Sequence, residues 1–503
     1  MSSPPPPTRP PGPKGILAHV LEETGLLSLY SSSRDVKLLC LQRFARMFAY
    51  GISTLILVAY LSALAIPKTD IGLFMTLTLA GDVCLSFVLT LFADALGRRA
   101  VLALGALLMS ASGVVFALFG EYWVLLAAAV VGVISPRPQE LTRSPLSGNE
   151  IGPFRAIEES IVAQLTDPRK RSDIYAWYSL LGLVGAACGC MACGWVLQHL
   201  TETLGWGFIR AYRAIYLGYA VLGLLKLTLT LLLSHAVESE EKKKKAAQDR
   251  ARDGETRPLL ESNADDAEAN SAPPKRGLRA LFPDISKESI PVVITLCLLF
   301  ALDSFGSGLA PLSWITYYFK SQFNVEEGQL GSIFFATQTI AATSMIVASS
   351  LAKRFGNVNT MIFTHLPSQI FRALLGVPSD VRLALAFLVL NASTQSMDTG
   401  PRSAFLAAIV LPAERTAVMG TVNVVRTTAQ SLGPLFTGIL VDRNLFWVTF
   451  VASGAVKMIY DLGLLAFFKN KERERERAER LRIQRNEEER REEGDCQVDG
   501  SRT

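Results

Sequence analysis

The sequence predicts an all-α membrane protein in which twelve transmembrane helices form two six-helix pseudo-repeats. Three observations support this fold class: the apolar composition, the spacing of the apolar segments and an internal repeat. Half of the 503 residues are hydrophobic and the mean hydropathy is +0.30, a balance more apolar than that of soluble domains of this length. Uncharged runs such as GISTLILVAYLSALAI (51–66) recur along the chain, and a helix needs about 20 such residues to cross a bilayer.

The apolar runs place the twelve spans in order. Residues 1–37, which precede the first of them, are rich in proline and polar residues, so we expect a disordered cytosolic tail and no cleavable signal peptide. The spans are predicted near residues 41–63, 71–93, 100–120, 122–152, 174–198, 213–234, 290–315, 328–350, 358–377, 381–405, 417–441 and 446–468.

A long charged segment divides the spans into two sets of six. Residues 236–287 contain almost no aromatic side chains, a composition typical of a disordered cytosolic linker. We therefore expect an N-terminal bundle, 38–235, a C-terminal bundle, 288–468, and after them a charged cytosolic tail, 469–503.

The two bundles share residues at a constant interval. Four residues in and before the fifth span recur 244 residues later, in and before the eleventh, and FADALGRR (92–99) likewise corresponds to LAKRFGNV (351–358). A repeat of six spans is typical of secondary transporters, whose halves rock about a site at the membrane midplane. The recurring residues are Pro168, Arg171, Gly189 and Gly194, which correspond to Pro412, Arg415, Gly433 and Gly438.

Lysine and arginine residues determine the predicted orientation. They gather on alternate loops, whereas the intervening loops contain few of them. Because positively charged loops stay in the cytosol, both termini are predicted to be cytosolic, which requires an even number of spans. The positive loops contain Arg98 and Arg99, residues 169–171, residues 242–245, and Lys353 and Arg354.

The loop between spans two and three resembles a signature of the major facilitator superfamily. LFADALGRR (91–99) is similar to the motif Gly-x-x-x-Asp-Arg-x-Gly-Arg-Arg, with departures at Thr90 and Ala95. The matching residues are Asp94, Gly97, Arg98 and Arg99. The resemblance covers roughly residues 38–468 and implies the fold of that family. It also implies a gate, in which the acidic residue caps a helix end and locks the two halves together on the cytosolic side.

Several charged residues lie inside predicted spans, where each one costs at least about 2.5–3.5 kcal/mol on insertion. Asp303 precedes GSGLAPLSW, a glycine-rich stretch broken by proline that is tolerated only beside a cavity, so we expect Asp303 to contact protons or substrate. Arg426 is predicted either to clamp an anionic substrate or to keep Asp398 or Glu150 ionised. Asp82 is a further candidate, with helix–helix hydrogen bonding as the alternative.

Other polar residues in the spans are expected to have structural roles. Lys457 and Asp461 are four residues apart and are predicted to share a helix face and neutralise each other. Lys226 and Arg372 are predicted to extend toward a membrane surface. His365 is predicted to be a structural histidine with its hydrogen bonds satisfied.

The cysteines of span five indicate close packing, and we expect no metal site and no cofactor. Cys190 and Cys193 lie near each other on a helix, whereas Cys188 points away. The surrounding GAACGCMACG is typical of small residues that let helices approach closely. An enzyme is not expected, because no catalytic triad, nucleotide-binding loop or metal cluster occurs in the sequence.

The repeat reveals an anomaly in span four. The first half uses 47 residues from Glu121 to Pro168, whereas the second uses 32 from Asp380 to Pro412. The segment RPQELTRSPL (137–146), with its two prolines, accounts for most of the excess and is predicted to be an insertion, either a lineage-specific loop or a gene-model error. Without it, three polar residues reach the cytosolic end of a translocation path: Asn149, Glu150 and Arg155.

Together these features predict a proton-coupled secondary transporter of a small solute. Gly185-x-x-x-Gly189 in span five, with predicted packing and hinge roles, resembles part of the glycine pattern of antiporters in the family and favours export of drugs or toxic compounds. The Gly-Pro pair that should follow occurs instead in span eleven, as Gly433-Pro434. The alternative is a membrane sensor or scaffold that keeps the fold without transport and signals through the linker and tail.

The expected partners are a small-molecule substrate, protons and the lipid bilayer, with no nucleic acid, and the expected state is a monomer. The segment ETRPLL (255–260) has acidic-dileucine spacing, which favours a vacuolar or endosomal membrane. The plasma membrane is the other predicted location.

Overall fold

The computed structural model is helical throughout the part of the chain that it describes. All its regular elements there are helices, so the all-α fold class is confirmed. The described residues are 26–132, 153–167, 170–238, 289–355, 357–398, 402, 409–410 and 414–467. Asn149, Glu150 and the predicted insertion, 137–146, lie outside these ranges.

The helices follow the order of the predicted spans. In the N-terminal half they are α2 (Leu26–Tyr30), α3 (Arg34–Ala63), α4 (Lys68–Leu96), α5 (Arg98–Leu118), α6 (Tyr122–Gly132), α7 (Pro153–Leu165), α8 (Arg171–Gln198) and α9 (Phe208–Leu231). In the C-terminal half they are α11 (Ile290–Leu309), α12 (Leu312–Phe323), α13 (Glu327–Phe355), α14 (Asn357–Leu374), α15 (Val381–Gln395), α17 (Arg415–Asp442) and a final described helix, Phe446–Phe467.

Two features of the chain explain where helices begin and break. Ser33 caps α3 by accepting a hydrogen bond from the backbone N–H of Val36, as the first turn of a helix requires. The predicted break in span seven is confirmed: α11 ends at Leu309, Pro311 stands in the cap position, and α12 begins at Leu312. The break places polar side chains of α11 next to irregular backbone.

The surface of the helices fits a lipid environment. Six of the described helices are long and apolar enough to cross a membrane. Large apolar side chains on α9 are exposed, among them Leu217 (54%), Val221 (59%) and Leu224 (50%), whereas soluble proteins rarely expose contiguous apolar patches of this kind. The chain is an integral, multi-pass membrane protein.

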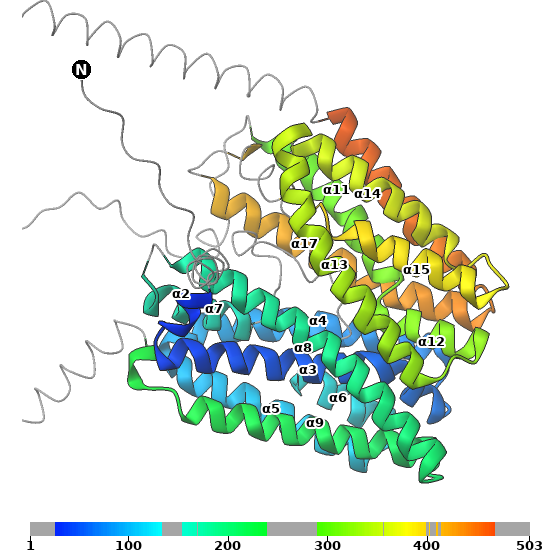
Figure 1. The fold of residues 1–503 in the computed structure, drawn as a ribbon, viewed down its shortest axis with the longest axis horizontal. Coiled ribbons are helices and arrows are strands. Elements are labelled where there is room, and N and C mark those ends of the chain that lie inside the picture. Colours follow the sequence, from blue (N-terminus) through cyan, green and yellow to red (C-terminus); the bar gives the residue numbers. More distant parts are fainter. Residues whose placement is uncertain are drawn as a thin grey trace, which may run out of the picture.

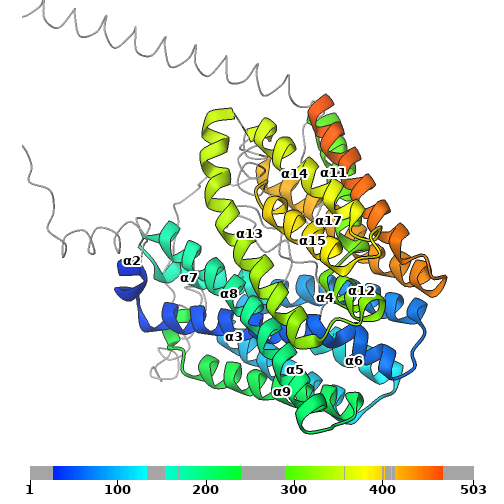
Figure 2. The ribbon, with the colours of Figure 1, turned by 45° about the vertical axis from the view of Figure 1, so that its right-hand side comes forward.

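The helices form two bundles that meet near one end. Figures 1 and 2 show α3 to α9 in one bundle and α11 onward in the other, close together around α12 and diverging toward the end where α2 lies. Contacts between the bundles use small residues, because α4 crosses α17 at Gly72 and Gly438, and α8 crosses α13 at Gly194. Tyr317 of α12 adds a ring that lies 4.8 Å from the ammonium nitrogen of Lys68.

The diverging end is the one that the charge pattern predicts to be cytosolic. Ser28 before the first long helix donates a hydrogen bond to Asp173 at the start of α8 (2.8 Å). The backbone N–H of Arg98 donates to Glu238, which follows α9 (3.0 Å). The starts of α3, α5 and α8 and the end of α9 therefore share one end of the bundle.

Gly72→Val is expected to destabilise the protein by about 1–3 kcal/mol, the usual cost of overpacking. A Cβ at Gly72 would lie 2.5 Å from the carbonyl oxygen of Pro434, so valine forces α4 and α17 apart. The matched control is Gly218→Val on α9, where an added Cβ meets nothing within 4 Å. Thermal unfolding of the purified variants checks this; equal unfolding midpoints would show that the two helices do not depend on this contact.

Packing within each bundle repeats the same pattern. A Cβ at Gly189 of α8 would overlap the carbonyl oxygen of Phe48 on α3, and a Cβ at Gly433 of α17 would overlap the backbone of Gly308 on α11. Gly189 and Gly433 are related by the 244-residue interval, so Phe48 and Gly308, 260 residues apart, occupy equivalent positions.

Candidate functional site

A buried carboxylate surrounded by cations lies at the centre of the C-terminal bundle. Asp303 of α11 is fully buried. Its Oδ2 accepts a hydrogen bond from Arg402 at 2.9 Å, and its Oδ1 accepts one from Lys457 at 3.0 Å. Arg426 of α17 lies 3.8 Å from the same carboxylate. Three helices and the segment that contains Arg402 therefore contribute to one ion cluster.

A second layer of contacts orients the cations of this cluster. Arg402 also forms an ion pair with Asp398, four residues earlier. Arg426 donates from Nε to the Ser304 hydroxyl at 3.2 Å, and its guanidinium carbon lies 5.0 Å from the centre of the Phe300 ring. The sequence offered Asp398 or Glu150 as the acid that Arg426 keeps ionised; in the structure the carboxylate within 4.0 Å of Arg426 is that of Asp303.

The predicted ion pair within the last helix is wrong. Lys457 reaches Asp303 on α11, and the carboxylate of Asp461 lies 2.8 Å from His365 Nδ1 on α14. The i,i+4 rule applies to exposed helix faces, whereas this face is buried against two other helices that present partners of their own. His365, which was predicted to be hydrogen-bonded and structural, is buried and has this carboxylate as its partner.

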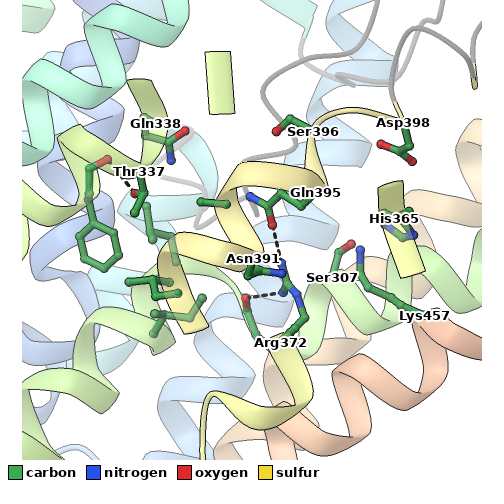
Figure 3. Close-up of a pocket in the computed structure, with 16 residues that line it drawn as sticks. Ser307, Thr337, Gln338, His365, Arg372, Asn391, Gln395, Ser396, Asp398 and Lys457 are labelled. Carbon is green, nitrogen blue, oxygen red and sulfur yellow. Dashed lines mark hydrogen bonds between the residues drawn. The ribbon is translucent and has the colours of Figure 1, made fainter. Parts of the chain in front are cut away.

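A polar pocket opens beside the cluster (Figure 3). It lies within the C-terminal half, and Lys457 and Asp398 belong both to its wall and to the cluster. Arg372 projects into it and donates hydrogen bonds to Gln395 Oε1 (2.9 Å) and to the Ala310 carbonyl (3.4 Å). The other lining residues are Ser307, Leu312, Ile315, Phe334, Thr337, Gln338, His365, Leu388, Asn391, Ala392 and Ser396.

The N-terminal bundle contains a second buried ion cluster. Glu158 of α7 is fully buried and accepts a hydrogen bond from Arg46 of α3 at 2.7 Å. The hydroxyl of Tyr178 on α8 donates to the same carboxylate. Lys226 of α9 lies 4.0 Å from its other oxygen. Lys226 and Arg372 were predicted to extend toward the membrane surface, and both predictions are wrong, because each side chain instead reaches a polar partner inside its own bundle.

The two clusters occupy equivalent places with opposite charges. Glu158 and Arg402 are 244 residues apart, as the repeat requires. Arg43 on α3 belongs to the N-terminal cluster, since its guanidinium carbon lies 5.2 Å from the centre of the Tyr178 ring. Arg43 and Asp303 on α11 are 260 residues apart, the interval that relates Phe48 to Gly308. A cation in one half thus stands where the other half has an acid, at two positions.

The final helix of each bundle keeps the same charge. Gly223 packs on Ser110 in the first half, and Gly454 packs on α14 in the second. These two glycines are 231 residues apart, and the same interval separates Lys226 from Lys457. Both lysines are buried beside an acid. The buried lysine is therefore the same in both halves, whereas the acid and the arginine exchange positions. As a result, the paired carboxylate lies on α7 in the first half and on α11 in the second.

The side chains of four predicted path residues can be placed, and those of three cannot. Asp82 of α4 is fully buried, and Asp398 is 2% exposed in the pocket wall. Arg155 belongs to α7, and only its backbone is described. Asn149 and Glu150 lie outside the described residues. The structure therefore brings Asp303, Asp398 and Arg426 together.

The signature loop is a sharp junction between α4 and α5. Gly97 caps α5 with φ at 100°, a conformation that favours glycine. Arg98 donates to Gln164 of α7 at 2.8 Å, and Arg99 donates to the carbonyl of Leu231 on α9. These partners belong to the N-terminal half. Asp94 lies on α4, and only its backbone is described.

The cysteines of α8 have packing partners on α3. The thiol of Cys190 donates to the Gly51 carbonyl at 3.3 Å, and that of Cys193 donates to the Ile52 carbonyl at 3.7 Å. A Cβ at Gly51 would overlap the backbone of Ala186. The interpretation of this stretch as a close helix contact is confirmed.

Sequence reasoning missed several residues of the clusters, among them Glu158, Arg46 and Arg402. Arg46 lies before the apolar core of its span, and Glu158 and Arg402 follow polar, glycine- and proline-containing stretches, so each resembled a loop-side charge. The repeat could have identified two of them, because charged residues occur at the equivalent positions 158 and 402.

Comparison with known proteins identifies relatives across nearly the whole chain. The family model of the Major Facilitator Superfamily matches residues 39–367 and 296–486. An uncharacterized membrane protein of Saccharomyces cerevisiae is 36% identical over 445 residues, which cover 87% of this chain and 94% of that protein.

Solved structures show the same fold at low sequence identity. A bacterial homologue of the iron transporter ferroportin, in an inward-facing state, superposes with a TM-score of 0.62 at 13% identity, covering 86% of this chain and 98% of the other. A bacterial homologue of the human lysosomal transporter Spinster, inward-facing and unoccupied, gives 0.61 at 15% identity, with 86% and 97% covered. A D-xylose-proton symporter gives 0.60 at 15% identity, again with 86% and 97% covered.

Proposed function

Because the chain belongs to the Major Facilitator Superfamily, we propose that it is a secondary active transporter that moves a small solute by alternating access of its two halves. The observation that carries this proposal is the ion cluster around fully buried Asp303, which borders a polar pocket. A bundle that needs only stability gains little from buried ions, since apolar side chains of similar volume stabilise as well or better. Buried charges within spans typically mark a solute or ion path.

Proton coupling is proposed to act through Asp303. Its two oxygens are occupied by Arg402 and Lys457, and a proton must compete with these cations for the same carboxylate. Ion pairing therefore releases the proton, and loss of the pairing allows its uptake. A carboxylate that changes partners as the halves rock would link proton movement to solute movement.

The proposed state of this structure is inward-facing. Its support is that the bundles diverge at the end rich in Arg98, Arg99 and Arg171, and meet at the opposite end around α12 (Figures 1 and 2). In the outward-facing state, Asp94, Arg98 and Arg99 are proposed to join the two halves.

Further path residues are proposed from the sequence: Asp82, Asn149, Glu150, Arg155, Asp398 and Arg426. We also propose, from the sequence, the domain boundaries given above, a monomeric state and cytosolic termini. The proposed location is the plasma membrane or a vacuolar or endosomal membrane. Export of drugs or toxic compounds is the proposed direction, with support only from the pattern of Gly185 and Gly189 in the sequence.

Solute flux in proteoliposomes under an imposed pH gradient tests the proposed function. The wild-type protein is expected to accumulate a solute above the level of protein-free liposomes, and collapse of the gradient with an ionophore is expected to abolish accumulation. A folded protein that binds a solute but moves none of it would instead be a sensor or scaffold.

A further inference from the structure

We propose that the pocket of the C-terminal half binds an organic carboxylate, with the anionic group at Arg372 and an apolar body against the apolar part of the lining. This inference rests on the proposed transport function, because it names the class of solute for the same site.

Arg372 is a partly buried cation that forms no ion pair with a described carboxylate. Its two hydrogen bonds go to neutral acceptors, Gln395 Oε1 and the Ala310 carbonyl. Among the described residues no carboxylate lies within 4.0 Å of its guanidinium, and its Nε has no hydrogen-bond partner. Shielding a charge from water without a directly paired counter-charge is costly, and a guanidinium fork matches a carboxylate in geometry and charge.

The charge of the surrounding wall also favours an anion. Lys457, like Arg372, lines the pocket (Figure 3). The acid of the wall, Asp398, is already held by Arg402. Among the described lining residues, the pocket therefore has two cations, Arg372 and Lys457, the second shared with Asp303, and one carboxylate, Asp398, which is paired with Arg402.

The rest of the lining selects for an apolar body with few polar groups. Side-chain amides of Gln338 and Asn391 can satisfy a hydroxyl or carbonyl group of a solute. The apolar part of the wall excludes a fully hydrated ion such as inorganic phosphate, because the ion would lose its water of hydration there without gaining hydrogen bonds from the protein. This apolar part consists of Leu312, Ile315, Phe334, Leu388 and Ala392.

Binding of the anion would act on the ion cluster directly. Lys457 lines the pocket and also donates to Asp303 at 3.0 Å. A solute carboxylate near Lys457 therefore competes with Asp303 for this lysine. The competition would free one oxygen of Asp303 for a proton, so that anion and proton bind in the same step.

Thermal stabilisation of the purified full-length protein in detergent tests this inference. The probes are benzoate, hexanoate and their neutral amides, benzamide and hexanamide, with inorganic phosphate as an anion that lacks an apolar body. We expect at least one carboxylate to raise the unfolding midpoint, and its amide and phosphate to have no effect. Stabilisation by the amide to the same extent, or by none of the carboxylates, would overturn the proposal.

Two variants place the binding at Arg372. Arg372→Gln is expected to weaken the response to the carboxylate at least about tenfold in midpoint concentration, equivalent to roughly 1.4 kcal/mol. Gln395→Glu puts a carboxylate 2.9 Å from the guanidinium in place of the present amide oxygen, so it should abolish the response while leaving the protein folded. The matched control is Arg382→Gln on the exposed start of α15, which should respond as the wild type does.

Thermal stabilisation and flux in proteoliposomes together separate this proposal from the function proposed above. If Arg372→Gln weakens carboxylate binding but the protein gives no flux in proteoliposomes, the proposed anion site stands and the proposed transport function is contradicted. Flux of a neutral solute that is unaffected by Gln395→Glu would retain the transporter and reject the anion site.

Discussion

Asp303→Asn is expected to abolish pH-driven solute accumulation in proteoliposomes, with flux lowered at least about 100-fold, equivalent to roughly 2.7 kcal/mol. The carboxamide cannot exchange a proton, and it leaves the cations of Arg402 and Lys457 without their shared acid. Accumulation of a radiolabelled solute under an imposed pH gradient is the measurement.

The controls separate lost coupling from lost folding. Asp303→Glu keeps the charge and should retain part of the flux. Glu121→Gln removes an exposed acid at the start of α6 and should behave as the wild type. Size-exclusion chromatography in detergent reports the folded fraction of each variant. If folded Asp303→Asn accumulates solute as the wild type does, Asp303 does not couple transport to protons.

Glu158→Gln is expected to lower the free energy of unfolding by about 3–5 kcal/mol, the usual cost of breaking a buried ion pair from one side. The change leaves Arg46 and Lys226 with a neutral amide in a fully buried position. Thermal unfolding of the purified variant, followed beside Glu121→Gln, is the measurement.

A double-mutant cycle shows whether the loss arises from the pair. Arg46→Met removes the cation that donates to Glu158 at 2.7 Å, so the double variant should recover part of the stability lost in Glu158→Gln. Strictly additive losses would mean that the two side chains do not stabilise each other, contrary to the proposed cluster.

The fold was predictable because lipid imposes strict requirements on sequence. Spans such as 100–120 and 213–234 need long apolar runs, and these correspond to α5 and α9. The break in span seven was predictable as well, since Pro311 cannot continue a helix and follows two glycines.

The site was predictable only in part, because ion pairs join helices that are far apart in sequence. Asp303 stood out as a charge in an apolar run, but its partners lie 99 and 154 residues away. Sequence spacing suggested that Lys457 pairs with Asp461, whereas the packing of three helices decides otherwise. Charged residues at equivalent positions of the repeat, Glu158 and Arg402, were the available clue to the buried network.

Proton movement measured with a pH-sensitive dye trapped inside proteoliposomes tests the central claim, that the buried ion cluster around Asp303 couples solute to protons, most directly. Addition of a transported solute without an imposed gradient is expected to change the internal pH in liposomes with wild-type protein, and to leave it unchanged with Asp303→Asn. An equal pH change in both would contradict this account.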